Sequence, residues 1–382
     1  MTVSRLKSQA DAPVRLGLLG CGRIAQLVHL GVLTRLRGAC LVAVADADPA
    51  CREHAGKLAP QAALYADYAE LLESERLDAV VIALPNQFHA DAATAALGKG
   101  CHVYLEKPLA SNLSEARRLL DCWRTSGLIG MIGFNYRFNR LYEEARRCIA
   151  AGRIGKMVAI RSVFSTACRE QPAWKLARQN GGGVLMDLAS HHMDLIRYLT
   201  GQEAQRVFAA IRSTRSEADS ATVELTLADG TPTQSFFSFN AVDEDRFEIF
   251  GDRGKLVVER YLSSGIEFTP AKLDYIRLKR LWQKTRSLAH PFEAWRRLRW
   301  PGYEPSYQAA LSHFSDAVRK QQPAAPDFRD GYRSLEILAA AEESAATGAV
   351  QPVRPAELSS GATDSTRVQQ PLKVIDARIW RS

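Results

Sequence analysis

The chain has 382 residues, of which 46% are hydrophobic and 24% are charged, and its formal net charge at pH 7 is +8. This length exceeds the usual size of one hydrophobic core, so two domains are expected, and the composition excludes a disordered or fibrous protein. The seven scattered cysteines include no Cys-x-x-Cys pair and fit neither a disulfide framework nor a zinc site, so no metal is expected.

The excess positive charge lies in one segment. Residues 272–299 hold nine basic and two acidic residues, whereas the rest of the chain is nearly neutral. The basic character therefore describes this segment, and no nucleic-acid partner is expected.

The N-terminus is polar, and the apolar run at residues 14–21 is too short for a secretory signal or a membrane span, which favours a cytoplasmic protein.

Strand and helix patterns alternate through the first third of the chain. Residues 14–20 form a buried apolar run, and an apolar-periodic helix is expected from the following turn to about Arg37. The repeated units predict an α/β fold, a doubly wound parallel sheet or Rossmann domain over residues 1–137, whose ligand binds beyond the carboxyl ends of the strands. Further strands are expected at 41–45, 78–84, 102–105 and 128–133, and helices at 88–99 and 111–126.

The turn after the first strand has the spacing of a dinucleotide-binding loop. Gly20 and Gly22 permit a tight turn and the close approach of a pyrophosphate, and Ala25 lets the helix pack on the strand. Asp46 ends the second strand 24 residues after Gly22, where a ribose-binding acid is expected. A carboxylate there accepts ribose hydroxyls and repels a 2′-phosphate, so NAD is favoured over NADP. The cofactor residues predicted in this region are Gly20, Gly22, Arg23, Ile24 and Asp46.

Two later strands end in polar residues at the same edge of the predicted sheet. Asn86 follows the strand at 78–84, and Glu106-Lys107-Pro108 closes the strand at 102–105. Because the carboxyl ends of parallel strands meet at one edge, Asn86 and Lys107 are expected beside the dinucleotide. The Lys107 ammonium would hold and polarise a substrate hydroxyl or ketone oxygen. A solvated lysine before a turn proline is the ordinary alternative.

Beyond residue 138 the pattern changes to one or two helices followed by a series of β-rich runs. It predicts a second, α+β domain over residues 138–354 with a large, mostly antiparallel open sheet. Helical patterns return at 305–320 and 330–347, and the tail at 355–382 lacks periodicity and is expected to be mostly mobile. The expected strands are 157–165, 205–214, 220–228, 232–241, 245–251, 254–259 and 265–269.

A glycine run at residues 181–183 opens a predicted helix that carries acidic and histidine residues. Asp187, His191 and Asp194 follow at helical spacing and share one face, whereas His192 is turned about a hundred degrees away. The glycines let the backbone turn sharply or approach a bound molecule. This spacing predicts His191 as a base oriented by Asp187, although an Asp–His pair at this spacing is more often structural.

With these motifs in place, the chain resembles the Gfo/Idh/MocA family of oxidoreductases over about residues 14–350. The resemblance implies that Lys107, Asp187 and His191 are catalytic, and that the second domain supplies the substrate pocket and often an oligomer interface. It also adds Pro85, His89 and Glu106, with Asn86 and Lys107, to the cofactor site. The matching motifs are the Gly20–Ala25 turn, Pro85-Asn86-x-x-His89, Glu106-Lys107-Pro108 and the glycine-rich helix from Gly181 to Asp194.

Further substrate residues and the basic segment are weaker predictions. Tyr136 and Arg137 follow the last strand of the first domain and are predicted to border the substrate, with a packed hinge as the alternative. Trp174-Lys175, shortly before the glycine run, is predicted to cover the nicotinamide or the sugar, and Asp187 and His191 are predicted to contact the substrate as well. The insertion at about 270–303 is amphipathic, and its alternatives are cover of the substrate domain or an oligomer contact, a peripheral membrane contact through 277–300, or binding of an anionic nucleotide-sugar.

The sequence thus predicts an NAD(P)-dependent dehydrogenase that acts on a CH–OH group. Hydride would pass between the nicotinamide and a secondary alcohol or ketone of a sugar, cyclitol or nucleotide-sugar, in a homodimer or homotetramer. Because the family includes redox-neutral members and NAD-sensing regulators, an NAD-dependent glycosidase and an NAD-sensing binding protein remain the alternatives. The sequence leaves open the substrate, the reacting hydroxyl and the physiological direction.

Overall fold

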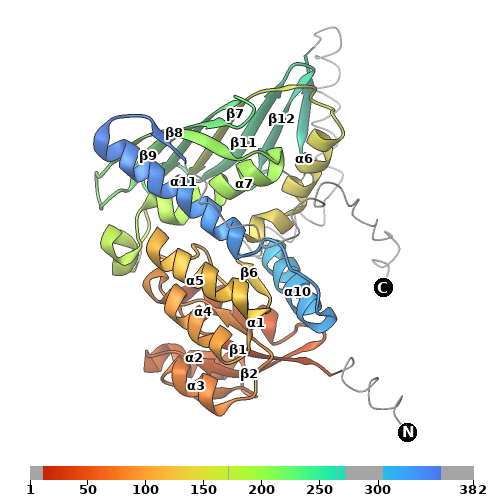
Figure 1. The fold of residues 1–382 in the computed structure, drawn as a ribbon, viewed down its shortest axis with the longest axis vertical. Coiled ribbons are helices and arrows are strands. Elements are labelled where there is room, and N and C mark those ends of the chain that lie inside the picture. The colour runs from red at the N-terminus through yellow and green to blue at the C-terminus, as the bar shows by residue number, and fades with distance from the viewer. Residues whose placement is uncertain (1–11, 171, 264, 272–303, 354–382) are drawn as a thin grey trace.

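The computed structural model describes residues 12–170, 172–263, 265–271 and 304–353 (Figure 1). The predicted membrane contact through 277–300, most of the predicted insertion and the predicted tail at 355–382 lie outside the described residues. Within the described ranges, no helix combines the length and the apolar character that crossing a bilayer requires.

The first half of the described chain forms a six-stranded sheet in the order β3-β2-β1-β4-β5-β6, with every pair parallel. This confirms the predicted Rossmann sheet, and its central strands are apolar because helices cover both faces. The helix after β1 ends at Leu33 rather than near Arg37. The strands are β1 (Val14–Leu19), β2 (Ala39–Ala45), β3 (Ala63–Tyr65), β4 (Ala79–Ile82), β5 (His102–Leu105) and β6 (Gly130–Ile132).

The helices of this layer begin at polar capping residues. Asp48, Asp67 and Asn112 accept main-chain N–H groups at the starts of α2, α3 and α5. Helix α2 buries only Ala55, which explains why no apolar period predicted it. The helical elements are a π-helical turn (Ala25–His29) that continues into α1 (Leu30–Leu33), then α2 (Pro49–Leu58), α3 (Tyr68–Ser74), α4 (His89–Gly98) and α5 (Leu113–Ser126).

The second layer is an eight-stranded sheet in the order β13-β12-β11-β7-β10-β9-β8-β14. It is mostly antiparallel, as predicted, with one parallel pair, β7–β10. Helices α6 (Arg140–Ala150), α7 (Ser190–Thr200) and α11 (Phe328–Thr347) lie against one face (Figure 1). The strands are β7 (Met157–Ser165), β8 (Ala204–Arg212), β9 (Ser220–Leu227), β10 (Pro232–Ser238), β11 (Glu244–Gly251), β12 (Gly254–Glu259), β13 (Glu267–Pro270) and β14 (Gln351–Pro352).

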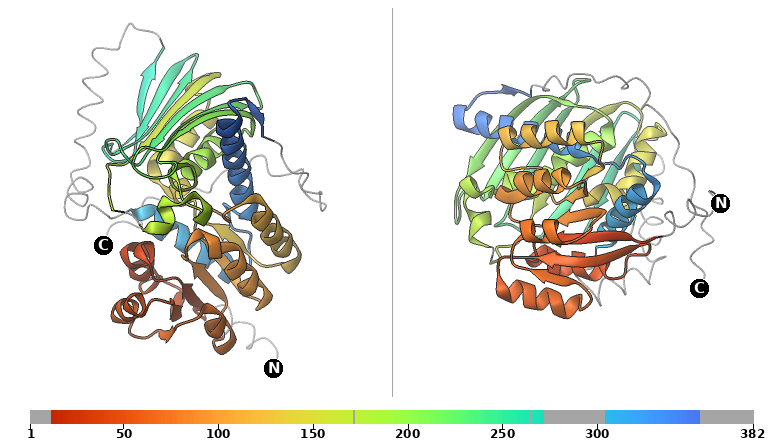
Figure 2. Two further views of the ribbon diagram at one scale, coloured as in Figure 1. Left: turned by 90° about the vertical axis from the view of Figure 1, so that its left-hand side faces the viewer. Right: turned by 60° about the horizontal axis from the view of Figure 1, so that its bottom comes forward.

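Helix α10 (Pro305–Lys320) returns to the first layer although it follows most of the second in sequence (Figure 2). Leu311 and Phe314 belong to the same buried cluster as Leu16 and Tyr104, and the rings of Tyr104 and Phe314 meet edge-on with centroids 5.8 Å apart. The chain then enters α11, which packs against α5 and against β8. Residues after 303 therefore contribute to both layers and help to hold them together.

Candidate active site

A cavity of about 870 Å³ lies between the strand-end loops of the first sheet and the inner side of the second layer. It is lined by residues from motifs that are far apart in the sequence, so the predicted convergence at one sheet edge is present in the structure. The predicted residues that line it are Gly20, Gly22, Arg23, Ile24, Asp46, Pro85, Asn86, His89, Glu106, Lys107, Trp174, Asp187 and His191.

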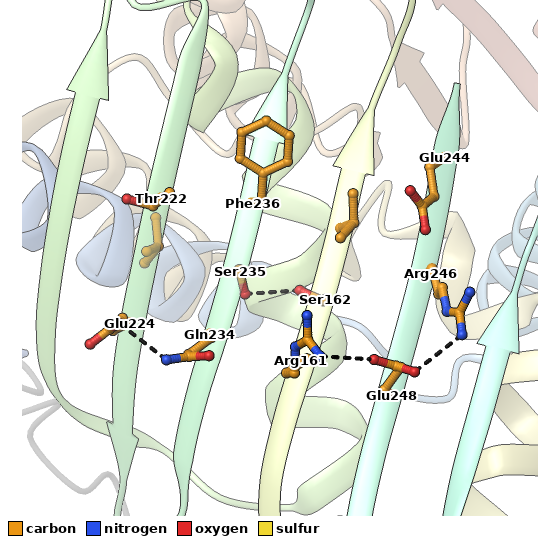
Figure 3. Close-up of a pocket in the computed structure, with 12 residues that line it drawn as sticks. Arg161, Ser162, Thr222, Glu224, Gln234, Ser235, Phe236, Glu244, Arg246 and Glu248 are labelled. Atoms are coloured by element: carbon orange, nitrogen blue, oxygen red, sulfur yellow. Dashed lines mark hydrogen bonds and ion pairs between the residues drawn. The ribbon is translucent and has the colours of Figure 1, made fainter. Parts of the chain in front are cut away.

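A second hollow, of about 640 Å³, lies on the outer face of the eight-stranded sheet (Figure 3). Its polar side chains pair with those of the neighbouring strands. Gln234 donates to Glu224 at 3.3 Å, and Arg161 lies 3.6 Å from Glu248. None of the predicted site residues lines this hollow, so the cavity between the layers is the candidate active site.

The turn after β1 is shaped by contact with the neighbouring strand end. Gly20 has a φ of +94°, and a Cβ there would lie 2.6 Å from the carbonyl oxygen of Ala83, so only glycine fits. At Gly22, by contrast, a Cβ would meet no described atom within 4 Å. The turn is therefore packed against the protein at Gly20 and open toward the cavity at Gly22.

Asp46 is fixed at the end of β2 by main-chain donors. Its carboxylate accepts the N–H groups of Cys21 at 2.6 Å and Asp48 at 2.8 Å. The Arg52 guanidinium lies nearby, but it donates to the main-chain oxygens of Asp46 at 2.6 Å and Ala47 at 3.0 Å. The acid is thus held beside the glycine turn, where its carboxylate lines the cavity.

Asn86 and His89 tie the loops around the cavity together. The Asn86 amide donates to the carbonyl oxygen of Gly181 at 2.8 Å and so joins the first layer to the glycine run. The two ring nitrogens of His89 lie 2.7 Å from the Pro108 oxygen and 2.9 Å from the Leu84 oxygen, and burial lowers the pKa of this histidine. Both side chains have structural partners in addition to their place in the cavity wall.

Lys107 and Asp187 meet across 80 residues of sequence. The Lys107 ammonium donates to the Asp187 carboxylate and to its main-chain oxygen, each at 2.8 Å. The other carboxylate oxygen accepts a hydrogen bond from Lys175 at 2.9 Å. Burial would raise the pKa of the Asp187 carboxyl, but the two ammonium groups outweigh it and hold that pKa well below its ordinary value.

This arrangement corrects the predicted role of Asp187 as the residue that orients His191. In the described part of the chain the carboxylate binds the two lysines, and no hydrogen bond joins it to the imidazole. The physical reason lies partly in the backbone, because Leu185–Ala189 form a π-helical turn, which changes the angular spacing assumed for a regular helix.

His191 is held by stacking instead. Its ring lies on that of Tyr136, with centroids 4.2 Å apart and an interplanar angle of 14°, and its Nδ1 is buried without a hydrogen-bond partner among the described residues. Burial and the Lys107 ammonium hold the pKa of His191 well below its ordinary value. Tyr136 is therefore behind the histidine and does not line the cavity, which corrects its predicted place beside the substrate.

His192 points away from the cavity, as the helical spacing predicts. Its Nε2 lies 3.2 Å from the Asp245 carboxylate, and its Nδ1 lies 3.1 Å from the Ser162 hydroxyl. Asp245 in turn accepts hydrogen bonds from Tyr142 and Arg260. This histidine belongs to a buried polar network beneath the sheet.

Arg137 also differs from its prediction as a substrate residue. Its guanidinium binds Asp194 at 2.5 Å and Asp330 at 3.0 Å, and it does not line the cavity. Asp194, predicted to share a stripe with Asp187 and His191, is buried in this ion pair. The packed-hinge alternative describes the segment from Asn135 to Phe138, because Arg137 there joins α7 to α11.

Gly182 in the glycine run serves chain packing rather than the approach of a ligand. A Cβ on Gly182 would lie 2.3 Å from the carbonyl oxygen of Lys175. The N–H of Gly183 donates to that same oxygen at 3.0 Å. The predicted sharp turn is present, and it brings the segment that carries Trp174 and Lys175 against Asp187.

Sequence reasoning missed several residues of the second wall. Lys175 was predicted with Trp174 to cover the nicotinamide or the sugar, but its contact with Asp187 was not predicted. Tyr307 lines the cavity from α10, 116 residues after His191, and no motif marks it. Arg260 does not line the cavity, but it lies over the ring of Tyr136 at 4.4 Å and binds Asp245 at 2.7 Å. The other missed lining residues of the second layer include Phe164, Thr166, Arg169 and Phe239.

Comparison with known proteins agrees with both layers. The model of an oxidoreductase family with an NAD-binding Rossmann fold matches residues 14–134, and that of the GFO/IDH/MocA C-terminal domain matches residues 142–257. Inositol 2-dehydrogenase of Rhizobium meliloti (strain 1021) is 30% identical over 343 residues, which cover 87% of this chain and 97% of that protein. Myo-inositol 2-dehydrogenase of Thermotoga maritima is 28% identical, over 87% of this chain and 96% of that protein.

A solved structure shares the whole fold. The scyllo-inositol dehydrogenase from Lactobacillus casei, with bound NAD(H) and scyllo-inositol, superposes with a TM-score of 0.73 over 89% of this chain and 99% of its own, at 21% identity. The fold and its cavity define an NAD-binding dehydrogenase that acts on CH–OH groups. The chain belongs to the GFO/IDH/MocA family of oxidoreductases.

The residues present fit the dinucleotide that this family binds. The open space at Gly22 leaves room for a pyrophosphate beside the turn, and the Asp46 carboxylate lines the same cavity within reach of a ribose. Glu106 lines it too, and its buried Oε1 lies 2.9 Å from Nε2 of His29, which holds the carboxylate in the cavity wall.

Proposed function

We propose that this chain transfers hydride between NAD and a secondary alcohol of a sugar, cyclitol or nucleotide-sugar. The observation that carries the proposal is the presence of Lys107, Asp187 and His191 in the same cavity as the glycine turn and Asp46. The substrate class is supported by relatives with such names, including a dTDP-3,4-didehydro-2,6-dideoxy-alpha-D-glucose 3-reductase from Saccharopolyspora spinosa, 29% identical over 67% of this chain. The inositol dehydrogenases of Rhizobium meliloti and Thermotoga maritima support a cyclitol.

His191 is the proposed base for the substrate hydroxyl. Because its pKa lies well below the ordinary value, the imidazole is neutral near pH 7 and can accept the hydroxyl proton. Bound NAD supplies the acceptor for the hydride that leaves the same carbon, which becomes a ketone as the cofactor becomes NADH. The proton then passes from His191 to water, and the reverse sequence reduces a ketone.

Lys107 is proposed to hold the reacting oxygen. An ammonium has three N–H groups, and two of them are directed to the side-chain and main-chain oxygens of Asp187. The third can donate to the substrate oxygen and stabilise the negative charge that develops on it. Asp187 would then act by fixing Lys107 in place.

NAD is the proposed cofactor in preference to NADP. The Asp46 carboxylate would repel a 2′-phosphate, and the nearby cation, Arg52, is already engaged by the main-chain oxygens of Asp46 and Ala47. The preference for NAD therefore rests on the Asp46 carboxylate, because main-chain oxygens orient the Arg52 guanidinium without neutralising its charge.

The experiment is to purify the protein, release and identify any bound nucleotide, and follow NADH absorbance with NAD and a panel of free sugars, inositols and UDP-sugars. Growth of absorbance with one class would support the dehydrogenase and identify its substrate. Cleavage of an aryl glycoside without net NADH would favour the redox-neutral glycosidase. Nucleotide binding with neither reaction would favour the NAD-sensing binding protein.

We also propose that the chain forms a homodimer or homotetramer through the outer face of the eight-stranded sheet. Phe208 and Phe236 are 41% and 37% exposed at outward-facing positions of β8 and β10, and Figure 3 shows Phe236 on this face. Exposed apolar side chains on one face are a feature of interaction surfaces. Light scattering coupled to size-exclusion chromatography tests this proposal, and a monomer at micromolar concentration would contradict it.

A further inference from the structure

Asp187 is held by two lysines from different parts of the chain. Lys107 follows β5 in the first layer, whereas Lys175 lies in the 3₁₀ turn Ala173–Leu176 of the second. One ammonium binds each carboxylate oxygen, at 2.8 and 2.9 Å. Lys175 is 30% exposed in its side chain and lines the cavity, so its ammonium belongs to the site and not to the outer surface.

The segment that carries Lys175 is fastened by its own main chain. The N–H of Lys175 donates to the Pro172 oxygen at 2.9 Å, and the Lys175 oxygen accepts from Gly183 at 3.0 Å. The Lys175 ammonium also lies 5.6 Å from the centre of the Trp174 ring, within range of a cation–π contact. These contacts aim the side chain at Asp187 before any substrate binds.

We propose that Lys175 is a positioning residue for hydride transfer, acting through Asp187. With both oxygens engaged, the carboxylate cannot turn toward His191, and its first oxygen stays on Lys107. The two ammonium groups and one carboxylate leave one net positive charge beside the reacting oxygen, with a neutral imidazole opposite. That charge favours the alkoxide character of the transition state more than it favours the neutral alcohol.

This inference rests on the proposed function and predicts a particular kinetic signature. Removing Lys175 leaves the Lys107–Asp187 pair with no net charge and frees one carboxylate oxygen. Transition-state stabilisation is then lost with little change in ground-state binding, so the loss is expected in kcat rather than in KM. If the Lys175–Asp187 ion pair only stabilised the fold, its removal would instead lower stability and cofactor binding together.

The test uses the full chain with Lys175→Met, Lys175→Arg and Lys175→Ala. For Lys175→Met we expect kcat to fall by roughly two orders of magnitude, with KM and NADH affinity within about threefold of wild type. Lys175→Arg should recover most of the loss, and millimolar ethylamine should partly restore Lys175→Ala. The matched control is Lys57→Met, since that ammonium lies 2.6 Å from Glu53, outside the cavity. This variant should leave kcat and KM unchanged.

Wild-type kcat in Lys175→Met, or a loss confined to KM, would overturn the inference. So would a lowered melting temperature with lost NADH binding that Lys175→Arg does not repair. If the wild-type protein reduces NAD with no substrate of the panel, the proposed function itself fails. In that case the positioning role is tested by a crystal structure of Lys175→Met. A carboxylate of Asp187 that is freed and has rotated supports the positioning role, and an unmoved carboxylate contradicts it.

Discussion

The imidazole of His191 lies almost flat on the phenol ring of Tyr136, with their centroids 4.2 Å apart. The guanidinium of Arg260 also lies over that ring, 4.4 Å from its centre. The contact fixes the plane of the histidine without a hydrogen bond to its Nδ1 and places it in an apolar, cation-rich setting. The stack thus fixes the orientation of the proposed base, whereas burial and the nearby Lys107 ammonium lower its pKa.

The pH dependence of turnover should report this setting. His191 can accept a proton only in its neutral form, and its pKa lies below the ordinary 6.5. The acidic limb of kcat/KM is therefore expected below pH 6.5, with activity retained as the pH falls through the range in which an ordinary histidine protonates. His191→Gln should be nearly inactive at every pH. An acidic limb above pH 6.5 in the wild-type enzyme would contradict the assignment of His191 as the base.

Substitution of Lys107 should separate chemistry from cofactor binding. Lys107→Met removes the proposed donor to the reacting oxygen, so turnover should fall by roughly 10²- to 10³-fold. NAD affinity, measured by calorimetry, should remain largely intact, because the pyrophosphate and ribose contacts lie elsewhere in the cavity. A variant with wild-type turnover would remove Lys107 from the mechanism.

Asp46 should control the choice of dinucleotide. Asp46→Asn keeps the shape of the side chain but removes its charge, so NAD affinity should fall by about 10- to 100-fold while that for NADP falls less or rises. The ratio of the two dissociation constants is the measurement. Asp67→Asn changes a similar capping carboxylate outside the cavity and serves as the control. An unchanged ratio in Asp46→Asn would count against ribose recognition by Asp46.

Arg137 should matter for stability. Arg137→Met leaves the buried Asp194 carboxylate without its principal partner, since Arg197 is 3.8 Å away, and should lower the free energy of unfolding by about 3–5 kcal/mol. Urea unfolding measures this change. The control Arg161→Met breaks a 3.6 Å pair of an arginine that is 63% exposed, and should cost less than about 1 kcal/mol. Equal effects in the two variants would show that burial of the pair is not decisive.

Gly182 should be needed for the placement of Lys175. Gly182→Ala forces a Cβ to within 2.3 Å of the Lys175 carbonyl oxygen, so the segment must move, at a cost of about 1–3 kcal/mol. We expect reduced turnover with NADH affinity retained, measured on the same preparation. Gly98→Ala, where a Cβ meets no described atom within 4 Å, is the control. Full activity in Gly182→Ala would show that the turn tolerates the added atom.

Local patterns predicted five of the six strands of the Rossmann sheet and most strands of the second sheet, whereas β3 and α3 were not predicted. The glycine turn and Asp46 lie on consecutive units of one βαβ arrangement, so strand ends alone bring them together. The alternation of buried and exposed residues likewise predicted β9 and β10 to within a few residues. Helix α2 escaped prediction because it buries a single side chain.

The partners of the site residues could not be predicted in the same way. The Lys107–Asp187 contact joins two layers. Neither motif contains information on which ammonium binds which oxygen of the carboxylate. The assumption of a regular helix assigned Asp187 to His191, whereas the π-helical turn and the two lysines direct it elsewhere. Tyr307 reaches the cavity only because α10 folds back onto the first sheet.

The return of α10 to the first sheet limits how this protein can be divided. Phe314 covers Tyr104 of β5, although seven of the eight strands of the second sheet lie between the two residues in the sequence. A gene fragment that ends near residue 137 would encode every strand of the dinucleotide layer and still leave an apolar surface open to water. Chimeras that combine the two halves from different relatives should therefore fold only when α10 and the first half come from the same protein.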